Sequence, residues 1–370
     1  MKKHISLLAA AFLGAAAILA GCSGQASETE SAQAQTKTAA QTEASAEASE
    51  AAQDTQAEEN AQPSAEAAGT DQAQGIRIGS LNGPTSMGLA RLMDQSAKGE
   101  TSQAYQFTMA GKADELVGKI ANGDLDIALL PANVASVLYS KTQGGVKVID
   151  INTLGVLYVV ASDDSISSIQ DLAGKTVYMT GKGTTPEFVM NYLLAENGLS
   201  ASDVTMEYKS EAAEVASVLK EDPTAIGVLP QPFATAACIQ NESLKTVLDL
   251  TEQWNILNGD TGSMMVTGVT IVRSEYLAEN DDAVKLFLEE HQASAAYTQE
   301  NPADAAELVA AQGIVEKAAI AQKALPYCNI VCLTGDEMKK ALEGYLEVLF
   351  NQDAQSVGGN LPGEDFYYIP

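Results

Sequence analysis

The sequence predicts an α/β fold of two lobes, each a mostly parallel β-sheet flanked by helices. Short apolar stretches typical of buried strands alternate with amphipathic helical stretches, and short polar joints separate them. Two longer apolar stretches, 154–162 and 264–272, bracket one run of such units. This bracketing indicates a chain that crosses between the lobes twice, on two crossover strands.

The first lobe begins with a strand over 76–81 and a helix marked by Leu89, Leu92 and Met93. A second helix then ends at Asn122-Gly123 and leads to a buried strand, "IALL". These units predict that residues 76–160 form the first part of lobe 1.

The second lobe repeats the alternation, with strands expected at 177–179, 204–208 and 226–229. A helix is expected from near Thr185 to Gly198. After the second long apolar stretch the pattern is helical. We therefore expect lobe 2 over 161–264, and the crossover return with the remaining lobe 1 helices over 265–370.

The N-terminal residues predict export. Two lysines precede an apolar run that ends in "LAGC", which resembles the lipobox of bacterial lipoproteins, and the run is shorter than the ~20 residues that span a bilayer. We expect a signal peptide over 1–22, lipidation of Cys22 and anchoring on the extracytoplasmic side of the cell membrane. Residues 23–75 are rich in Ala, Gln, Glu, Ser and Thr, which predicts a disordered tether.

Charge and cysteine content limit the possible functions. The formal net charge of −28 argues against binding to nucleic acid or to anionic lipid through charge. Beyond Cys22 only Cys238, Cys328 and Cys332 remain, so disulfides are not the framework of the fold. Cys328 and Cys332 are either bridged or free, and the sequence leaves both possibilities open.

Three segments resemble one family, the solute-binding lipoproteins of ABC importers that take up sulfonates, taurine, nitrate or thiamine-related pyrimidines. The segments are "ANGDLDIALLPANVAS" (121–136), "ISSIQDLAGKTVYMTGKGTTPEFVMNYLLAENGL" (166–199) and "AIGVLPQPFATAA" (225–237). The resemblance implies the type II periplasmic-binding fold, with two lobes that close on a solute. It also implies partners, namely the permease and ATPase subunits of the importer.

Four strand-to-helix joints are candidate binding positions, because ligands of open α/β sheets bind at the carboxyl ends of strands. An ordinary role as helix caps is the alternative for each joint. Gly83 lets the backbone approach a ligand closely, and hydroxyl and amide side chains beside it offer hydrogen bonds. The predicted ligand-binding residues are Asn82, Gly83, Thr85, Ser86, Met87, Pro131, Asn133, Thr184, Thr185, Gln231, Phe233 and Trp254.

These residues are mostly neutral, whereas oxyanions are usually held with help from Arg or Lys. A small polar heterocycle of the thiamine-pyrimidine type therefore suits them, and a sulfonate or related acid stays open because helix N-termini also bind anions. We expect no metal and no cofactor.

An enzyme that shares the fold, of the menaquinone-pathway or pyrimidine-synthase kind, is one alternative. The only histidine after residue 22 is His291, which we place on a surface-like helix, and no catalytic set accompanies it, so we predict a non-enzyme. A ligand-binding module of a sensor is the other alternative. For the importer component we expect a monomer whose lobes close by flexing near Val159 and Thr267.

Overall fold

The structure, a computed structural model, describes residues 75–370. The expected signal peptide with Cys22, and the expected tether up to residue 74, lie outside the described residues. Within the described part, no helix is both long enough and apolar enough to span a membrane.

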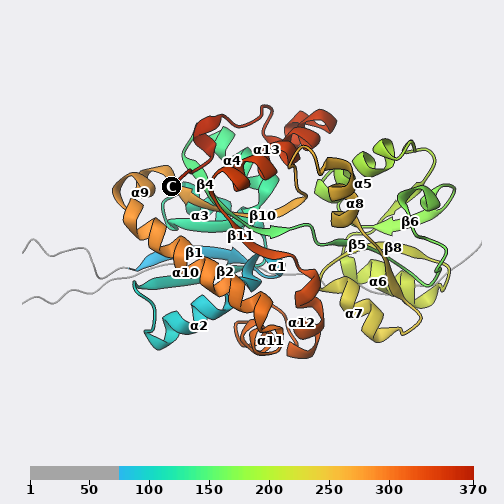
Figure 1. The fold of residues 1–370 in the computed structure, drawn as a ribbon, viewed down its shortest axis with the longest axis horizontal. Coiled ribbons are helices and arrows are strands. Elements are labelled where there is room, and N and C mark those ends of the chain that lie inside the picture. Colours follow the sequence, from blue (N-terminus) through green and yellow to red (C-terminus); the bar gives the residue numbers. More distant parts are fainter. Residues whose placement is uncertain (1–74) are drawn as a thin grey trace, which may run out of the picture. The chain divides into compact units, whose positions relative to one another are not determined.

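The strands form two sheets, one in each lobe (Figure 1). The lobe 1 sheet has six strands in the order β11-β4-β10-β3-β1-β2, and the lobe 2 sheet has five in the order β7-β6-β8-β5-β9. The lobe 1 strands are β1 (Ile76–Leu81), β2 (Tyr105–Ala110), β3 (Ile127–Pro131), β4 (Val146–Leu154), β10 (Val266–Arg273) and β11 (Ile330–Leu333). The lobe 2 strands are β5 (Leu157–Ala161), β6 (Thr176–Met179), β7 (Thr205–Tyr208), β8 (Ile226–Pro230) and β9 (Lys245–Asp249).

Most strands of each sheet point in one direction. In lobe 1, β1 pairs in parallel with β2 and β3, while β10 runs antiparallel to both β3 and β4. In lobe 2, β6 pairs in parallel with β7 and β8, while β5 runs antiparallel to β8 and β9. The strand that enters each sheet after a crossover, β5 or β10, thus runs against its neighbours, and in lobe 1 the edge strand β11 is also antiparallel to β4.

Helices cover both faces of each sheet (Figure 1). One face of lobe 1, the α10 face, carries α2 (Ala90–Lys98), α10 (Asp281–Glu300), α11 (Pro302–Ala311) and α12 (Ala318–Ala324). The opposite face, the α13 face, carries α3 (Ala113–Ala121), α4 (Ala132–Thr142) and α13 (Gly335–Gln352). Lobe 2 has α6 (Ala212–Glu221) and α7 (Phe233–Gln240) on one face, and α5 (Thr185–Glu196) and α8 (Leu250–Asn258) on the other. Two short helices, α1 (Pro84–Met87) and α9 (Ser274–Glu279), complete lobe 1.

The first crossover differs from the expected single strand over 154–162. The strand of this stretch is β5, which begins at Leu157 in lobe 2, whereas Leu154 is the last residue of β4 in lobe 1. The sheets therefore separate at Gly155 and Val156, a few residues before the expected boundary at 160.

Gly155 lies where the two crossovers meet. A Cβ atom added there would be 2.0 Å from Cε of Met265 and 2.2 Å from Oγ1 of Thr251. The Gly155 carbonyl accepts a 2.6 Å hydrogen bond from Nδ2 of Asn329, which precedes β11. The neighbouring Val156 carbonyl accepts a 2.9 Å bond from the Gln231 backbone N–H. Elements of both lobes are thereby fixed to two residues of the chain.

The flexing points expected near Val159 and Thr267 lie inside the sheets. Val159 pairs with Val228 of β8 on one side and with Leu248 of β9 on the other. Thr267 lies within β10, at an irregularity in the pairing with β4. Flexing of this crossover therefore stays a prediction, and its residues outside the sheets are Gly155 and Val156, just before β5.

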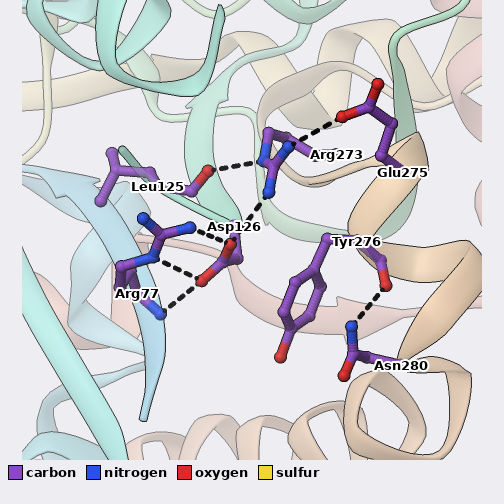
Figure 2. A network of polar contacts seen from close by, with 7 residues as sticks. All are labelled: Arg77, Leu125, Asp126, Arg273, Glu275, Tyr276 and Asn280. Carbon is purple, nitrogen blue, oxygen red and sulfur yellow. Dashed lines mark hydrogen bonds and ion pairs between the residues drawn. The ribbon is translucent and has the colours of Figure 1, made fainter. Parts of the chain in front are cut away.

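A buried carboxylate joins three strands at the opposite end of the lobe 1 sheet (Figure 2). Asp126 directly precedes β3, and its side chain is only 4% exposed. Its Oδ2 accepts hydrogen bonds from Nε and the backbone N–H of Arg77 on β1, at 2.9 and 3.0 Å. Its Oδ1 pairs with Arg273 at the end of β10, at 3.3 Å. Burial alone would raise the pKa of the Asp126 carboxyl, but the hydrogen bonds from Arg77 and Arg273 outweigh it and hold that pKa below its usual value.

We expect Asp126→Asn to lower the free energy of unfolding by roughly 2–3 kcal/mol, because it removes the charge that pairs two arginines, one of them a third exposed. Urea denaturation measures the loss. Asp124→Asn, at an exposed position two residues earlier, is the matched control and should change little. Since the native pKa of Asp126 is lowered, its contribution is complete above the unfolded value of about 3.9 and is lost as the pH falls through the native pKa. The difference between wild type and Asp126→Asn must therefore shrink on acidification, and a constant difference would contradict the assignment.

Candidate functional site

A pocket of about 380 Å³ lies between the lobes and is lined by both of them. Lobe 1 contributes the joint after β1, and lobe 2 contributes the joint after β8 together with the first turns of α7. A third wall comes from the segment between α11 and α12. The lining residues are Asn82, Gly83, Pro232, Phe233, Ala236, Ile314, Val315, Glu316 and Ile320.

The lobe 1 wall depends on a glycine. Gly83 has φ 116° and ψ −158°, a conformation that only glycine adopts without strain, and the space where a Cβ would stand is open. Asn82 before it is exposed, and its backbone N–H donates to the Ala110 carbonyl at 3.1 Å. The bond fixes the backbone of the joint, and Asn82 is one of the residues that line the pocket.

The lobe 2 wall presents an aromatic ring. Phe233 begins α7 and is 42% exposed, an unusual exposure for so large an apolar side chain. Gln231, two residues earlier, is buried, and its Oε1 accepts a 2.8 Å hydrogen bond from the Thr235 hydroxyl. Gln231 therefore shapes the joint and does not line this pocket.

Sequence reasoning missed the third wall. Ile314 and Val315 follow Gly313, which has φ 71° and ends the turn after α11. The only signal was a pair of β-branched residues placed directly after a glycine in an otherwise helical region. This pair of residues does not indicate that the segment lies next to the strand-to-helix joints of the two lobes.

Three of the predicted residues that follow Gly83 point into lobe 1. The Ser86 hydroxyl lies within hydrogen-bonding distance of the Ser80 hydroxyl and donates to the Leu81 carbonyl. Met87 is fully buried. Thr85 is buried too, and its Cγ2 lies 2.5 Å from the place of a Cβ at Gly268. They support the joint from beneath.

The residues predicted from the other two joints lie away from the pocket. Asn133 begins α4 on the α13 face and donates to the Ser356 carbonyl at 3.4 Å, and Pro131 pairs with Gly268 in the sheet. Thr185 begins α5, and the Thr184 hydroxyl before it donates to the Gly181 carbonyl at 2.7 Å. Here α13 and the turn after it lie between the lobes, because Gln352 also donates to the Phe188 carbonyl at 2.6 Å.

Trp254 belongs to the core. It is fully buried, with its ring centroid 4.7 Å from that of Tyr192 and 5.4 Å from that of Tyr345. These tilted ring contacts join α5, α8 and α13, so the aromatic surface of Trp254 is covered by other side chains of the protein.

The charge lining the pocket is a single acid, Glu316. No lysine or arginine of the described residues lines it. Lys182, the basic residue nearest to a predicted joint, lies instead over the Tyr208 ring at 5.6 Å.

A second, larger hollow of about 820 Å³ runs along β9 and reaches Tyr327. Its lining includes Gln231 and Tyr158 together with several charged side chains. We take the smaller pocket as the candidate site, because two strand-to-helix joints from different lobes, the joints of Asn82 and of Phe233, both line it.

The expectation that His291 lies on a surface-like helix is wrong. His291 is fully buried, on the same face of α10 as the buried residues Val284, Phe287 and Ser294. Cys328 and Cys332 are both free thiols.

The comparison with known families agrees with this architecture. A family model described as NMT1/THI5-like matches residues 111–305, more than half of the chain. The chain belongs to the NMT1/THI5-like family. The match includes the lobe 2 wall of the pocket and excludes the other two. Among curated proteins, none matches the chain in sequence.

Solved structures show the same fold for this NMT1/THI5-like protein. An ABC transporter structure from Parabacteroides distasonis is similar with a TM-score of 0.65 and 22% identity, covering 79% of this chain and 98% of that one. The periplasmic aliphatic sulphonate binding protein SsuA from Escherichia coli gives 0.62 and 15%, covering 80% and 92%. The periplasmic sulfonate-binding protein SsuA from Methylobacillus flagellatus KT gives 0.60 and 14%, covering 81% and 93%. These likenesses confirm the predicted two-lobed periplasmic-binding fold.

We expect Gly83→Ala to destabilise the protein by roughly 1–2 kcal/mol, because alanine is strained at this φ although space is available. Thermal unfolding measures the change. Gly111→Ala is the control, since a Cβ there also meets open space and the backbone does not require glycine. Equal stability of the two variants would show that the joint relaxes without cost.

Proposed function

We propose that the protein is the extracytoplasmic solute-binding component of an ABC importer, anchored through lipid on Cys22. In this role it captures a small polar organic solute between its lobes and delivers it as a monomer to permease and ATPase subunits. The observation that carries the proposal is the pocket to which both lobes contribute a strand-to-helix joint. Membership of the NMT1/THI5-like family and the fold of the solved relatives support it.

The lining of the pocket favours a neutral or cationic heterocycle over a sulfonate. Phe233 offers an exposed ring for stacking, and Ile314, Val315 and Ile320 surround it with apolar surface. The Asn82 amide can both donate and accept, which suits the edge of a heterocycle. Glu316 would repel a sulfonate, and no basic side chain of the described pocket lining compensates for it.

The crossovers provide the place for closure. Between the sheets the first crossover has only Gly155 and Val156, and the second has the stretch from Gly259 to Met265. Rotation there would change the distance between Asn82 and Phe233 without breaking either sheet. The solute therefore stabilises the closed form in proportion to the contacts it makes with both lobes.

The first test is native mass spectrometry of the protein purified without refolding, to identify a co-purified solute. Calorimetry with that compound should then show Phe233→Ala and Asn82→Ala each weakening binding about tenfold, because each removes one wall contact. Ile256→Ala and Asn255→Ala, at exposed positions on α8, are the matched controls and should bind as wild type. Unchanged affinity in both pocket variants would contradict the site.

Closure predicts a smaller radius of gyration when the wild type is saturated with the same compound. Small-angle X-ray scattering measures it, and identical curves with and without solute would contradict closure. Enzymatic conversion of the bound compound, followed in the same samples, would contradict the proposed role as a carrier.

A further inference from the structure

Three metal-binding side chains of different elements converge inside lobe 1. Asp150 comes from β4, His291 from α10 and Cys332 from β11. His291 Nδ1 lies 3.2 Å from Oδ2 of Asp150 and 4.0 Å from Sγ of Cys332. All three donor atoms lie within 4.8 Å of one another. None of the three residues lines the solute pocket.

The buried carboxylate lacks a positive partner. Asp150 and His291 are both 0% exposed, and no lysine or arginine of the described residues pairs with Asp150. His291 Nε2 is buried without a hydrogen-bond partner. The Asp150 carboxylate therefore has two polar neighbours from other elements, His291 Nδ1 at 3.2 Å and the Thr270 hydroxyl at 2.8 Å.

Cys332 gives this cluster a route to solvent. It lies on β11, the edge strand of the sheet, and is partly exposed, unlike its two partners. A metal ion could therefore reach the cluster from this side and bind the Cys332 sulfur as a thiolate.

We propose that Asp150 Oδ2, His291 Nδ1 and Cys332 Sγ bind one divalent metal ion of the zinc class. Two anionic ligands and one neutral ligand make the complex with a divalent ion electrically neutral, which suits a buried site. Cysteine, histidine and carboxylate are together the ligand set of Zn²⁺, and its bonds of about 2.0–2.3 Å require Cys332 to move slightly toward the other two. On binding, the Cys332 proton leaves to solvent and the ring proton of His291 resides on Nε2. A water molecule at the exposed side of Cys332 completes the coordination.

The ion would fasten three elements behind the candidate site. It joins β4 and the edge strand β11 to α10, which packs beneath the residue after α1. A Cβ placed at Gly88 would lie 3.6 Å from His291 Nε2. The metal therefore supports the base of lobe 1 on which the Asn82–Gly83 joint rests, and its presence does not depend on which solute the pocket binds.

The test is metal binding by the whole protein prepared with and without chelator. We expect about one zinc ion per chain by elemental analysis after dialysis, and with Co²⁺ a thiolate-to-metal charge-transfer band together with tetrahedral d–d bands. Cys332→Ser should lose the charge-transfer band and most of the metal. Cys328→Ser and Cys238→Ser, which change the other two thiols of the described residues, should keep both.

A second readout needs no variant. Added zinc should protect Cys332 from alkylation, measured peptide by peptide with Cys238 as the internal reference, and should raise the unfolding temperature by mass action. The proposal is overturned if wild type binds no Zn²⁺ or Co²⁺, if Cys332→Ser binds as much as wild type while circular dichroism shows both folded, or if zinc leaves alkylation of Cys332 unchanged.

Discussion

The arrangement of the two lobes depends on the absence of a side chain at Gly155. A Cβ there would collide with Met265 of the other crossover and with Thr251 of α8, so any larger residue would force both side chains to move. The bond from Gln231 to the Val156 carbonyl then fixes the start of the Pro232–Phe233 joint to the crossover. Through Asn329 the same two residues hold the chain that leads into β11. The hydrogen bond to Val156 thus fixes the position of the lobe 2 wall of the pocket relative to the first crossover.

Local pattern predicted the presence of two lobes and many of the helices and strands, because amphipathic periodicity and capping residues act at short range. The helix after Thr184 illustrates this, since Pro186 lies in its first turn and Gly198, with φ 77°, follows its end. The expectation of helices alone after 264–272 was wrong, because β11 adds an edge strand to the lobe 1 sheet by pairing with β4. The short strands β2 and β9 were not expected either. The apolar stretch 154–162 was misjudged because hydrophobicity reports that a residue is buried and not in which sheet. His291 was misjudged because a single polar residue on a helix stripe does not reveal the Asp150 that faces it.

The candidate site was predictable only in part. The ends of strands identified the joints, and those containing Asn82 and Phe233 meet at one pocket. The packing of the following helix decides toward which face of the sheet a joint points. The other two joints lie beside α13 and the turn after it, and not at the pocket. Trp254 has an aromatic ring of the kind that stacks on ligands, yet the rings of Tyr192 and Tyr345 cover it. Trp254 is covered by residues that are far from it in the chain. The periodicity of apolar residues in the sequence does not reveal such contacts.

The three pocket walls come from different parts of the chain, and the family match covers only one of them. The NMT1/THI5-like match ends at residue 305 and begins at 111, so it includes Phe233 but neither Asn82 before it nor Ile314 after it. The matched range also contains Asp126, which pairs with arginines at the far end of the sheet. Family membership therefore covers most of the scaffold and one wall of the candidate pocket. The other two walls lie outside the matched range, so the family assignment carries no information about the solute contacts they would make.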